Sequence, residues 1–121
     1  MPTLTLEYTP NLSFDKQHVL TELNRTLIDS KQFSEADIKS RAICMTDFMI
    51  GISTEPRAFV IIKLGLLSGR SIETRDAIAD ALLSRTQALI PAPNGVHTQY
   101  CIDLVEHERE RYRKAVVSHP H

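Results

Sequence analysis

The stretch Ala58-Phe59-Val60-Ile61-Ile62-Lys63-Leu64 is a nearly continuous apolar run near the middle of the chain. Aromatic and β-branched residues dominate it, and these residues favour extended strands. Uninterrupted apolar runs of this length are typical of strands that are buried on both faces. The run therefore predicts an internal strand of a sheet, and we expect the other elements to be arranged around it.

A helix and a second strand are predicted after this run. Ser71 can cap a helix, and Pro91 stops it. The stretch 91–95, Pro-Ala-Pro-Asn-Gly, is the clearest turn in the chain, and residues 100–105 close the pattern as a strand. The buried stripe of the helix is expected to consist of Ile72, Ile78, Ala79, Leu82, Leu83, Ala88 and Leu89.

The first half of the chain repeats this plan. Residues 3–8 alternate small or polar with apolar side chains, as strands do, and a helix is predicted from a cap at Ser13 to Ser30. Residues 38–50 are predicted to be extended until Gly51 and Pro56 break the segment. The buried positions are expected to be Val19, Leu20, Leu23, Leu27 and Ile28 in the helix, and Ile43, Met45 and Phe48 in the extended segment.

Two successive strand-helix-strand units predict an α+β fold with one mixed sheet. Right-handed crossovers place both helices on one face of that sheet. The chain offers no third core helix, yet its strands are expected to be apolar on both faces. We therefore expect the second face to be buried against other copies in a small ring-like homo-oligomer.

Composition excludes several classes of protein. The 121 residues, 42% of them hydrophobic, suit one domain over 1–121. A net charge of −1 gives no basic surface for nucleic acid. We find neither an apolar stretch approaching about 20 residues nor a signal sequence, so we expect a cytoplasmic protein without a membrane partner.

Cysteine and histidine residues point to no cofactor. Cys44 and Cys101 lie in apolar, strand-like runs, so we expect reduced core residues more than a disulfide or redox pair. The five histidines have no spacing suited to a metal. No metal or other cofactor is expected.

Pro2 is the most reactive candidate. If Met1 is removed, Pro2 becomes a secondary amine that can act as a base near neutral pH. An amine held at the start of a buried strand is desolvated, which lowers its pKa from the ordinary range of about 7.7–8.0. The alternative is that proline simply suits the position before a strand, because it has no ladder hydrogen bond to give.

Several short motifs occur in a specific order along the chain. They are Met1-Pro2 opening a strand with Glu7 after it, the stretch 38–42 (Ile-Lys-Ser-Arg-Ala), the stretch 67–71 (Leu-Ser-Gly-Arg-Ser) opening the second helix, and the late stretches 102–104 and 112–114. Together these motifs resemble the 5-carboxymethyl-2-hydroxymuconate isomerase family of the tautomerase superfamily. The resemblance spans almost the whole chain. It implies a cofactor-independent isomerase of aromatic-compound catabolism, assembled as a homotrimer of tandem β-α-β units.

The resemblance also implies roles for four residues. Pro2 is expected to be the catalytic base, and Arg41, Arg70 and Lys39 are expected to bind a carboxylate substrate, with Lys39 standing where some relatives carry a second arginine. Arginine offers a planar fork for two-point binding of a carboxylate. Taken without the resemblance, Arg70 can be a solvated residue beside a helix cap, and Lys39 and Arg41 can be charges that protect a sheet edge.

Two other functions remain open. Another proline-dependent activity of the superfamily, such as that of a decarboxylase, hydratase or dehalogenase, would use the same amine in its protonated form. A non-catalytic oligomeric binding protein is the second alternative, and retention of Met1 would favour it because the Pro2 nitrogen would then be an amide without basicity.

Overall fold

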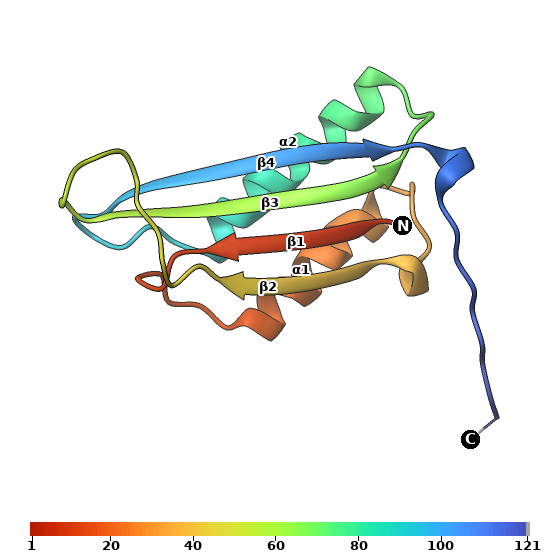
Figure 1. Ribbon diagram of the computed structural model, residues 1–121, viewed down its shortest axis with the longest axis horizontal. Helices are drawn as coiled ribbons and strands as arrows, with labels where there is room; N and C mark the ends of the chain where they lie inside the picture. Colours follow the sequence, from red (N-terminus) through yellow and green to blue (C-terminus); the bar gives the residue numbers. More distant parts are fainter. Residues whose placement is uncertain (121) are drawn as a thin grey trace.

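The computed structural model describes residues 1–120. His121, the last residue of the predicted domain, lies outside the described residues. Four strands form one layer and two helices form a second layer behind it (Figure 1). The elements are β1 (Thr3–Tyr8), α1 (Lys16–Asp29), β2 (Lys39–Cys44), β3 (Arg57–Leu67), α2 (Ile72–Leu89) and β4 (His97–His107), with short 3₁₀ turns η1 (Glu35–Asp37) and η2 (Arg109–Arg111).

The sheet is mixed, with the strand order β2-β1-β3-β4. β1 pairs in parallel with β2, β3 pairs in parallel with β4, and the two pairs meet where β1 runs antiparallel to β3. Each parallel pair is connected through one helix, and both helices cover the same face (Figure 1). The predicted α+β architecture of tandem β-α-β units is therefore confirmed.

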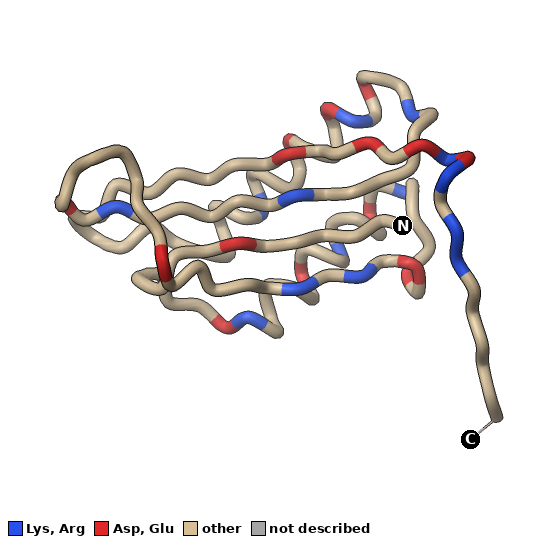
Figure 2. The backbone as a smooth tube through the Cα atoms, in the orientation of Figure 1, with Lys and Arg blue, Asp and Glu red and all other residues tan. Residues whose placement is uncertain are grey.

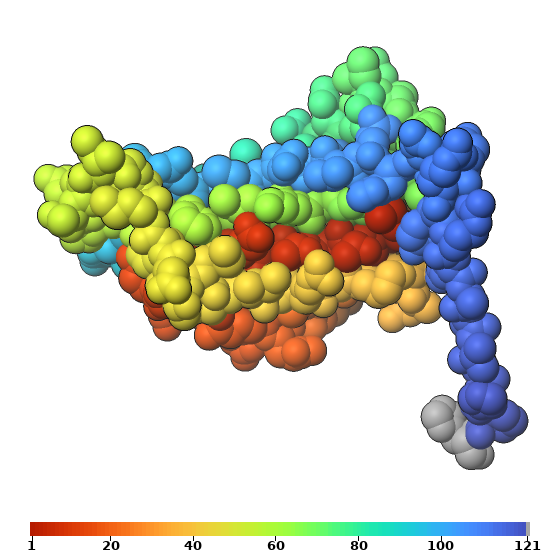
Figure 3. Space-filling view, viewed as in Figure 1, coloured from red at the N-terminus to blue at the C-terminus, as the bar shows by residue number. Residues whose placement is uncertain are grey.

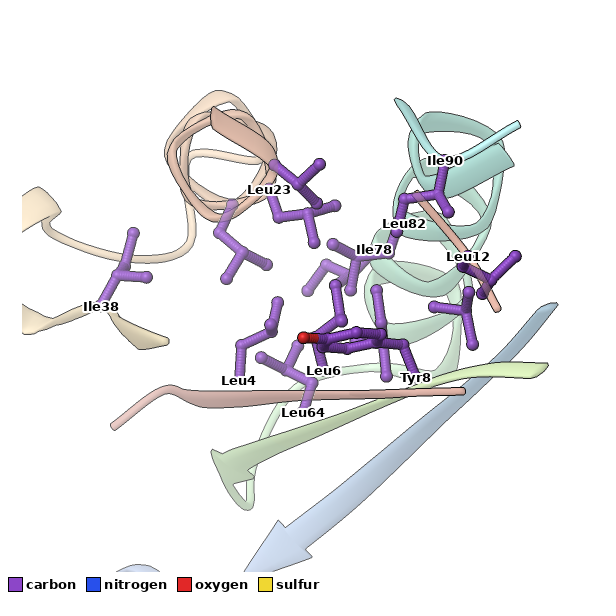
Figure 4. Close-up of a cluster of buried hydrophobic side chains, with 14 of the residues drawn as sticks. Leu4, Leu6, Tyr8, Leu12, Leu23, Ile38, Leu64, Ile78, Leu82 and Ile90 are labelled. Carbon is purple, nitrogen blue, oxygen red and sulfur yellow. The ribbon is translucent and has the colours of Figure 1, made fainter. Parts of the chain in front are cut away.

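The core lies between the helices and one face of the sheet. Leu4, Leu6 and Tyr8 of β1 point toward Leu23 of α1 and Leu82 of α2 (Figure 4). Alternate residues of β3 reach the same layer, because successive side chains of a strand point to opposite faces. The buried set from β3 is Ala58, Val60, Ile62, Leu64 and Leu66.

The helices follow the predicted period with local differences. Val19, Leu23 and Leu27 are buried in α1, as expected, but the cap is Asp15 rather than Ser13, because Asp15 Oδ1 accepts the His18 N–H at 3.1 Å. Ser71 caps α2 as predicted.

The predicted stripe of α2 was too wide. The buried residues of α2 are Ile78, Leu82 and Thr86, which are four residues apart, and Thr86 was not predicted. Ile72, which is 63% exposed, lies six residues before Ile78, and the exposed Ala88 lies two residues after Thr86. Six residues correspond to roughly 240° around a helix and two to roughly 200°, so these two side chains face away from the sheet.

β2 is shorter than the predicted extended segment. It ends at Cys44, directly after its partner β1 runs out, and Met45 N–H donates the last bond to the Tyr8 carbonyl at 2.8 Å. The prediction that Ile43 and Phe48 are buried was wrong, whereas Met45 is half-buried. Ile43 faces away from the helices, where no described element covers it.

The second face of the sheet is open in the single chain. Figure 3 shows it between the segment that connects β2 to β3 and the C-terminal segment. Its side chains are mixed: Phe59 and Ile61 are half-buried, while Lys63 lies 3.5 Å from Glu7. The expected burial of residues 58–64 on both faces is therefore found on one face only.

The cysteines are free, as expected, but their assignment to the core was wrong, because both are exposed. Cys44 ends the edge strand, and Cys101 pairs with Ile61 and points to the open face. Among the described helices, none is both long and apolar enough to cross a membrane.

Two neighbouring leucines of α2 test the packing of the helix layer. Leu82 is fully buried, whereas Leu83 is only half-buried. We expect Leu82→Ala to lower the free energy of unfolding by about 2–5 kcal/mol, because it leaves a cavity against the sheet. Urea unfolding at a fixed protein concentration measures this change, with Leu83→Ala as the matched control. Equal losses in the two variants would contradict the arrangement of α2.

Candidate active site

The candidate site lies at one end of the sheet. Because β1 is antiparallel to β3, the starts of β1 and β2 meet the ends of β3 and β4 there (Figure 1). Pro2 is buried directly before β1, and its carbonyl oxygen accepts the Lys39 N–H at 3.2 Å. The start of the chain is thus held against β2 by a backbone hydrogen bond.

The N-terminal amine is surrounded by groups that disfavour its protonation. Burial contributes most to lowering the pKa of the Met1 amine below its ordinary value of 8.0, and the positive charges of Lys39 and Lys114 lower it further, while Asp37 opposes them. The amine donates a hydrogen bond to the Tyr112 hydroxyl at 2.9 Å. A group in this position loses its proton more readily than an ordinary chain terminus does.

Asp37 is itself neutralised by lysines. Lys114 Nζ lies 2.6 Å from Asp37 Oδ1, and Lys39 Nζ donates to the Asp37 carbonyl oxygen. The hydrogen bond from Lys114 is the main reason why the pKa of Asp37 is lowered. The carboxylate is thus paired with Lys114, while Lys39 bonds the backbone of the same residue, and the amine is left in a positive environment. Figure 2 shows basic segments on β2 and on the C-terminal segment near the N-terminus.

Arg70 is fixed in the loop between β3 and α2. Its guanidinium donates to Gln32 Oε1 at 3.2 Å, to the Gln32 carbonyl at 3.1 Å and to the Leu67 carbonyl at 3.2 Å, and it stacks 4.6 Å from the centre of the Phe33 ring. A guanidinium has five N–H donors, and three are used among the described residues. One N–H on each terminal nitrogen is therefore left for a ligand.

A cavity of about 230 Å³ lies between Met1, Asp37 and Arg70, whereas Pro2 and Lys39 are not part of its lining. Its lining is made by Met1, Gln32, Phe33, Ser34, Asp37, Leu67, Arg70 and Arg109. A larger groove of about 630 Å³ lies between the helices, but there Arg25 and Arg85 both pair with Glu22. Residues 1–120 contain no cluster of three or more His, Cys, Asp or Glu that could hold a metal ion.

The structure brings three of the four predicted residues to one end of the sheet. Pro2 lies there beside the backbone of Lys39, and Arg70 lines the cavity with Met1. Arg41 pairs with Thr5 and lies two residues further along β2 than Lys39. Its side chain is exposed and is not part of the cavity lining. A single chain therefore does not place Arg41 beside the amine.

Sequence reasoning missed several groups around the amine. Tyr112 and Lys114 were noted only as parts of a C-terminal motif, and Asp37, Gln32 and Arg109 were given no role. The contact between Tyr112 and Met1 spans 111 positions in the chain, so no local pattern could predict it. The one available signal was the basic run at residues 111–114 after the last strand.

A comparison with known families identifies the family to which the chain belongs. The family model for 5-carboxymethyl-2-hydroxymuconate isomerase matches residues 2–117. The chain belongs to this family. It is therefore an isomerase of the tautomerase superfamily, as the motifs indicated.

Solved structures agree with this assignment. A 5-carboxymethyl-2-hydroxymuconate isomerase from Deinococcus radiodurans R1 is 29% identical with a TM-score of 0.86, covering 94% of this chain and 88% of that chain. A 5-carboxymethyl-2-hydroxymuconate delta-isomerase is 18% identical with a TM-score of 0.77, covering 97% and 89%. A fused 4-OT described as a symmetric trimer is 15% identical with a TM-score of 0.71, covering 93% and 91%. No curated protein matches the chain significantly in sequence.

The electrostatic environment of the amine can be tested through Lys39. Removing its charge in Lys39→Gln should raise the pKa of the N-terminal amine toward its ordinary value, because one of the two lysines that repel the proton is lost. An acylating reagent attacks only the unprotonated amine, so labelling measured by mass spectrometry should begin at higher pH in this variant.

Lys16→Gln is the matched control for this measurement. Lys16 lies over the rings of Tyr8 and Phe14, at 5.5 Å from each ring centre, near the other end of β1. Its removal should leave the labelling profile unchanged. A profile that does not move in Lys39→Gln would show that this lysine does not act on the amine.

Proposed function

We propose that the mature protein begins at Pro2 and isomerises an unsaturated 2-hydroxy or 2-keto di- or tricarboxylate, such as 5-carboxymethyl-2-hydroxymuconate. Pro2 is the base and no cofactor takes part. The observation that supports this proposal most is the position of Met1, which lines a cavity with Arg70 and whose amine has a lowered pKa. Removal of Met1 would leave the amine of the buried Pro2 at the same end of the sheet. We further propose that residues 1–121 form one tautomerase-like domain and act in the cytoplasm.

The proposed reaction needs one group that takes up a proton and gives it back. The neutral Pro2 amine removes a proton from the substrate and leaves a delocalised anion. The protonated amine then returns a proton at another atom of the conjugated system. The double bond therefore moves, and the product has the same atoms and charge as the substrate. Such catalysis works best when the base has a pKa near the working pH. Burial and the charges of Lys39 and Lys114 lower the pKa of the Met1 amine, and we expect them to act in the same direction on a Pro2 amine.

The substrate carboxylates are proposed to bind to Arg70, Arg41 and Lys39. Arg70 keeps two N–H groups available beside the cavity, which suits a two-point contact. Lys39 lies near the amine but also donates to the Asp37 carbonyl. Arg41 lies on the open side of the sheet, so its proposed role requires a neighbouring copy of the chain.

Assembly as a homotrimer would provide that copy. The open face carries Phe59 and Ile61, and Ile43 and Val105 are about two-fifths exposed, at 40% and 39%. Burying apolar surface stabilises by roughly 25 cal/mol per Å², which favours covering this face. The fused 4-OT trimer has the same fold, and this likeness supports the proposal for the present chain.

Pro2→Ala tests the catalytic role of proline. We expect the fold to be retained and turnover to fall by roughly 100-fold or more, because general base catalysis contributes about 10²–10⁴-fold and a primary amine differs in basicity and placement. Kinetics with 5-carboxymethyl-2-hydroxymuconate measure the effect. Intact mass must first show that the wild-type chain lacks Met1.

The pH profile of the wild type separates the alternatives. A neutral base requires the rate to rise with pH through the pKa of the amine, whereas an acid, as in the decarboxylase, hydratase or dehalogenase alternative, requires it to fall. A chain that retains Met1 and is inactive would favour the binding-protein alternative. Equal activity of wild type and Pro2→Ala would remove proline from the mechanism.

Mixing two impaired variants tests the shared site. Arg41→Ala should lower activity by roughly 10- to 100-fold, the scale of a charge-assisted hydrogen bond. If Pro2 of one copy works with Arg41 of another, coassembly of Pro2→Ala and Arg41→Ala subunits restores native residues in roughly a quarter of the sites of a closed ring. Recovery of activity in the mixture is the expected result.

Light scattering at micromolar concentration accompanies this experiment. The wild type should be a trimer, and Ile61→Asp on the open face should dissociate it. Ile72→Asp makes the same change at a position of α2 that is 63% exposed, and it should leave the trimer intact. An active monomer, or the absence of any recovery on mixing, would contradict a site at a subunit boundary.

A further inference from the structure

Arg109 lies beside Arg70 although the two residues are far apart in the sequence. It begins the turn η2 after β4, and its Nη2 donates to the Ser68 carbonyl at 3.1 Å, while its backbone N–H donates to Ser68 Oγ at 3.4 Å. These bonds tie the segment after β4 to the loop after β3. Arg109 and Arg70 thereby line the same cavity.

Neither of these arginines is paired with a carboxylate among residues 1–120. Arg70 donates to an amide and two carbonyl oxygens, and Arg109 donates to a carbonyl oxygen. By contrast, four other arginines of the described chain lie within ion-pair distance of a glutamate: Arg25, Arg75, Arg85 and Arg111.

The two guanidinium groups repel one another. Burial contributes most to lowering the pKa of Arg70, and the positive charge of Arg109 adds to it. Asp37, the acidic residue of the lining, is bound to Lys114. Two cations held together by neutral oxygens, with their remaining N–H groups free, form a site for an anion.

We infer that Arg109 is a second carboxylate-binding residue of this cavity, and that together with Arg70 it selects substrates with two or more carboxylates over monocarboxylates. This inference rests on the proposed function for its catalytic meaning. A carboxylate between or across the two guanidinium groups would relieve their repulsion and replace water at their free N–H groups. A substrate with an apolar end in place of the second carboxylate would leave Arg109 without a partner.

The test compares Arg109→Gln with Arg111→Gln. Arg111 belongs to the same turn, but its side chain is 76% exposed and lies 3.7 Å from Glu108. Glutamine keeps a hydrogen-bonding side chain and removes the charge in both variants. Thermal unfolding shows whether each variant is folded, and Arg109→Lys, which keeps the charge but loses the fork, provides a second variant.

The first readout is binding without chemistry, measured by calorimetry with adipate and hexanoate, which have the same number of carbons. We expect the wild type and Arg111→Gln to prefer adipate. Arg109→Gln should bind adipate roughly tenfold or more weakly and hexanoate with unchanged affinity, and Arg109→Lys should lie between. Adipate binding that is unchanged in Arg109→Gln, or lost equally for both ligands, would overturn the inference.

The second readout is kinetic and separates this inference from the proposed function. With an unsaturated 2-hydroxy dicarboxylate, Arg109→Gln should raise KM with little change in kcat, whereas a monocarboxylate analogue should show no change. A wild type that isomerises neither compound would refute the proposed function, while the adipate measurement would still decide the role of Arg109. An active wild type with the same KM in Arg109→Gln would refute the inference alone.

Discussion

The antiparallel pairing of β1 with β3 is the constraint on which the site depends. Thr3 pairs with Gly65, so the residues before β1 lie beside the residues after β3. The two parallel pairs then bring the start of β2 and the end of β4 to the same place. If the two halves met in parallel, the N-terminal amine and the loop that carries Arg70 would lie at opposite ends of the sheet. The position of the amine beside Arg70 therefore depends on the antiparallel direction in which the two units join.

Electrostatics at this end of the sheet favour a neutral amine and a bound anion together. Burial and two lysines disfavour the protonated form of the amine. The positive charges of the arginine pair attract any anion that enters the cavity. One carboxylate, Asp37, limits the effect, but Lys114 holds it. A substrate that carries its own negative charge would offset the repulsion among these cations when it binds. The same charge would raise the pKa of the amine in the complex, so the free and the bound enzyme should titrate differently.

The architecture could be predicted from the sequence because it depends on local periodicity. The alternation at residues 3–8 and the row of Val19, Leu23 and Leu27 each indicate which face is buried, and both were confirmed. The run at 58–64 correctly predicted an internal strand, but its side chains are buried only on the helix side. Errors arose where burial depends on neighbours that local pattern does not reveal. Ile43 and Cys101 are apolar residues of strands, but they face the side that no described element covers.

The site was predictable only in part, and the reason is distance along the chain. Arg70 follows a buried strand and precedes a capped helix, which is a local signal, and Pro2 opens the first strand. Tyr112 and Arg109 come from the segment after β4 and reach the site only once all four strands are in place. The final turn of the chain therefore completes a cavity whose other walls are set by the two repeated units. Because the repeated units supply no counterpart of this segment, Arg109 and Tyr112 are additions to the site that the β-α-β architecture alone does not provide.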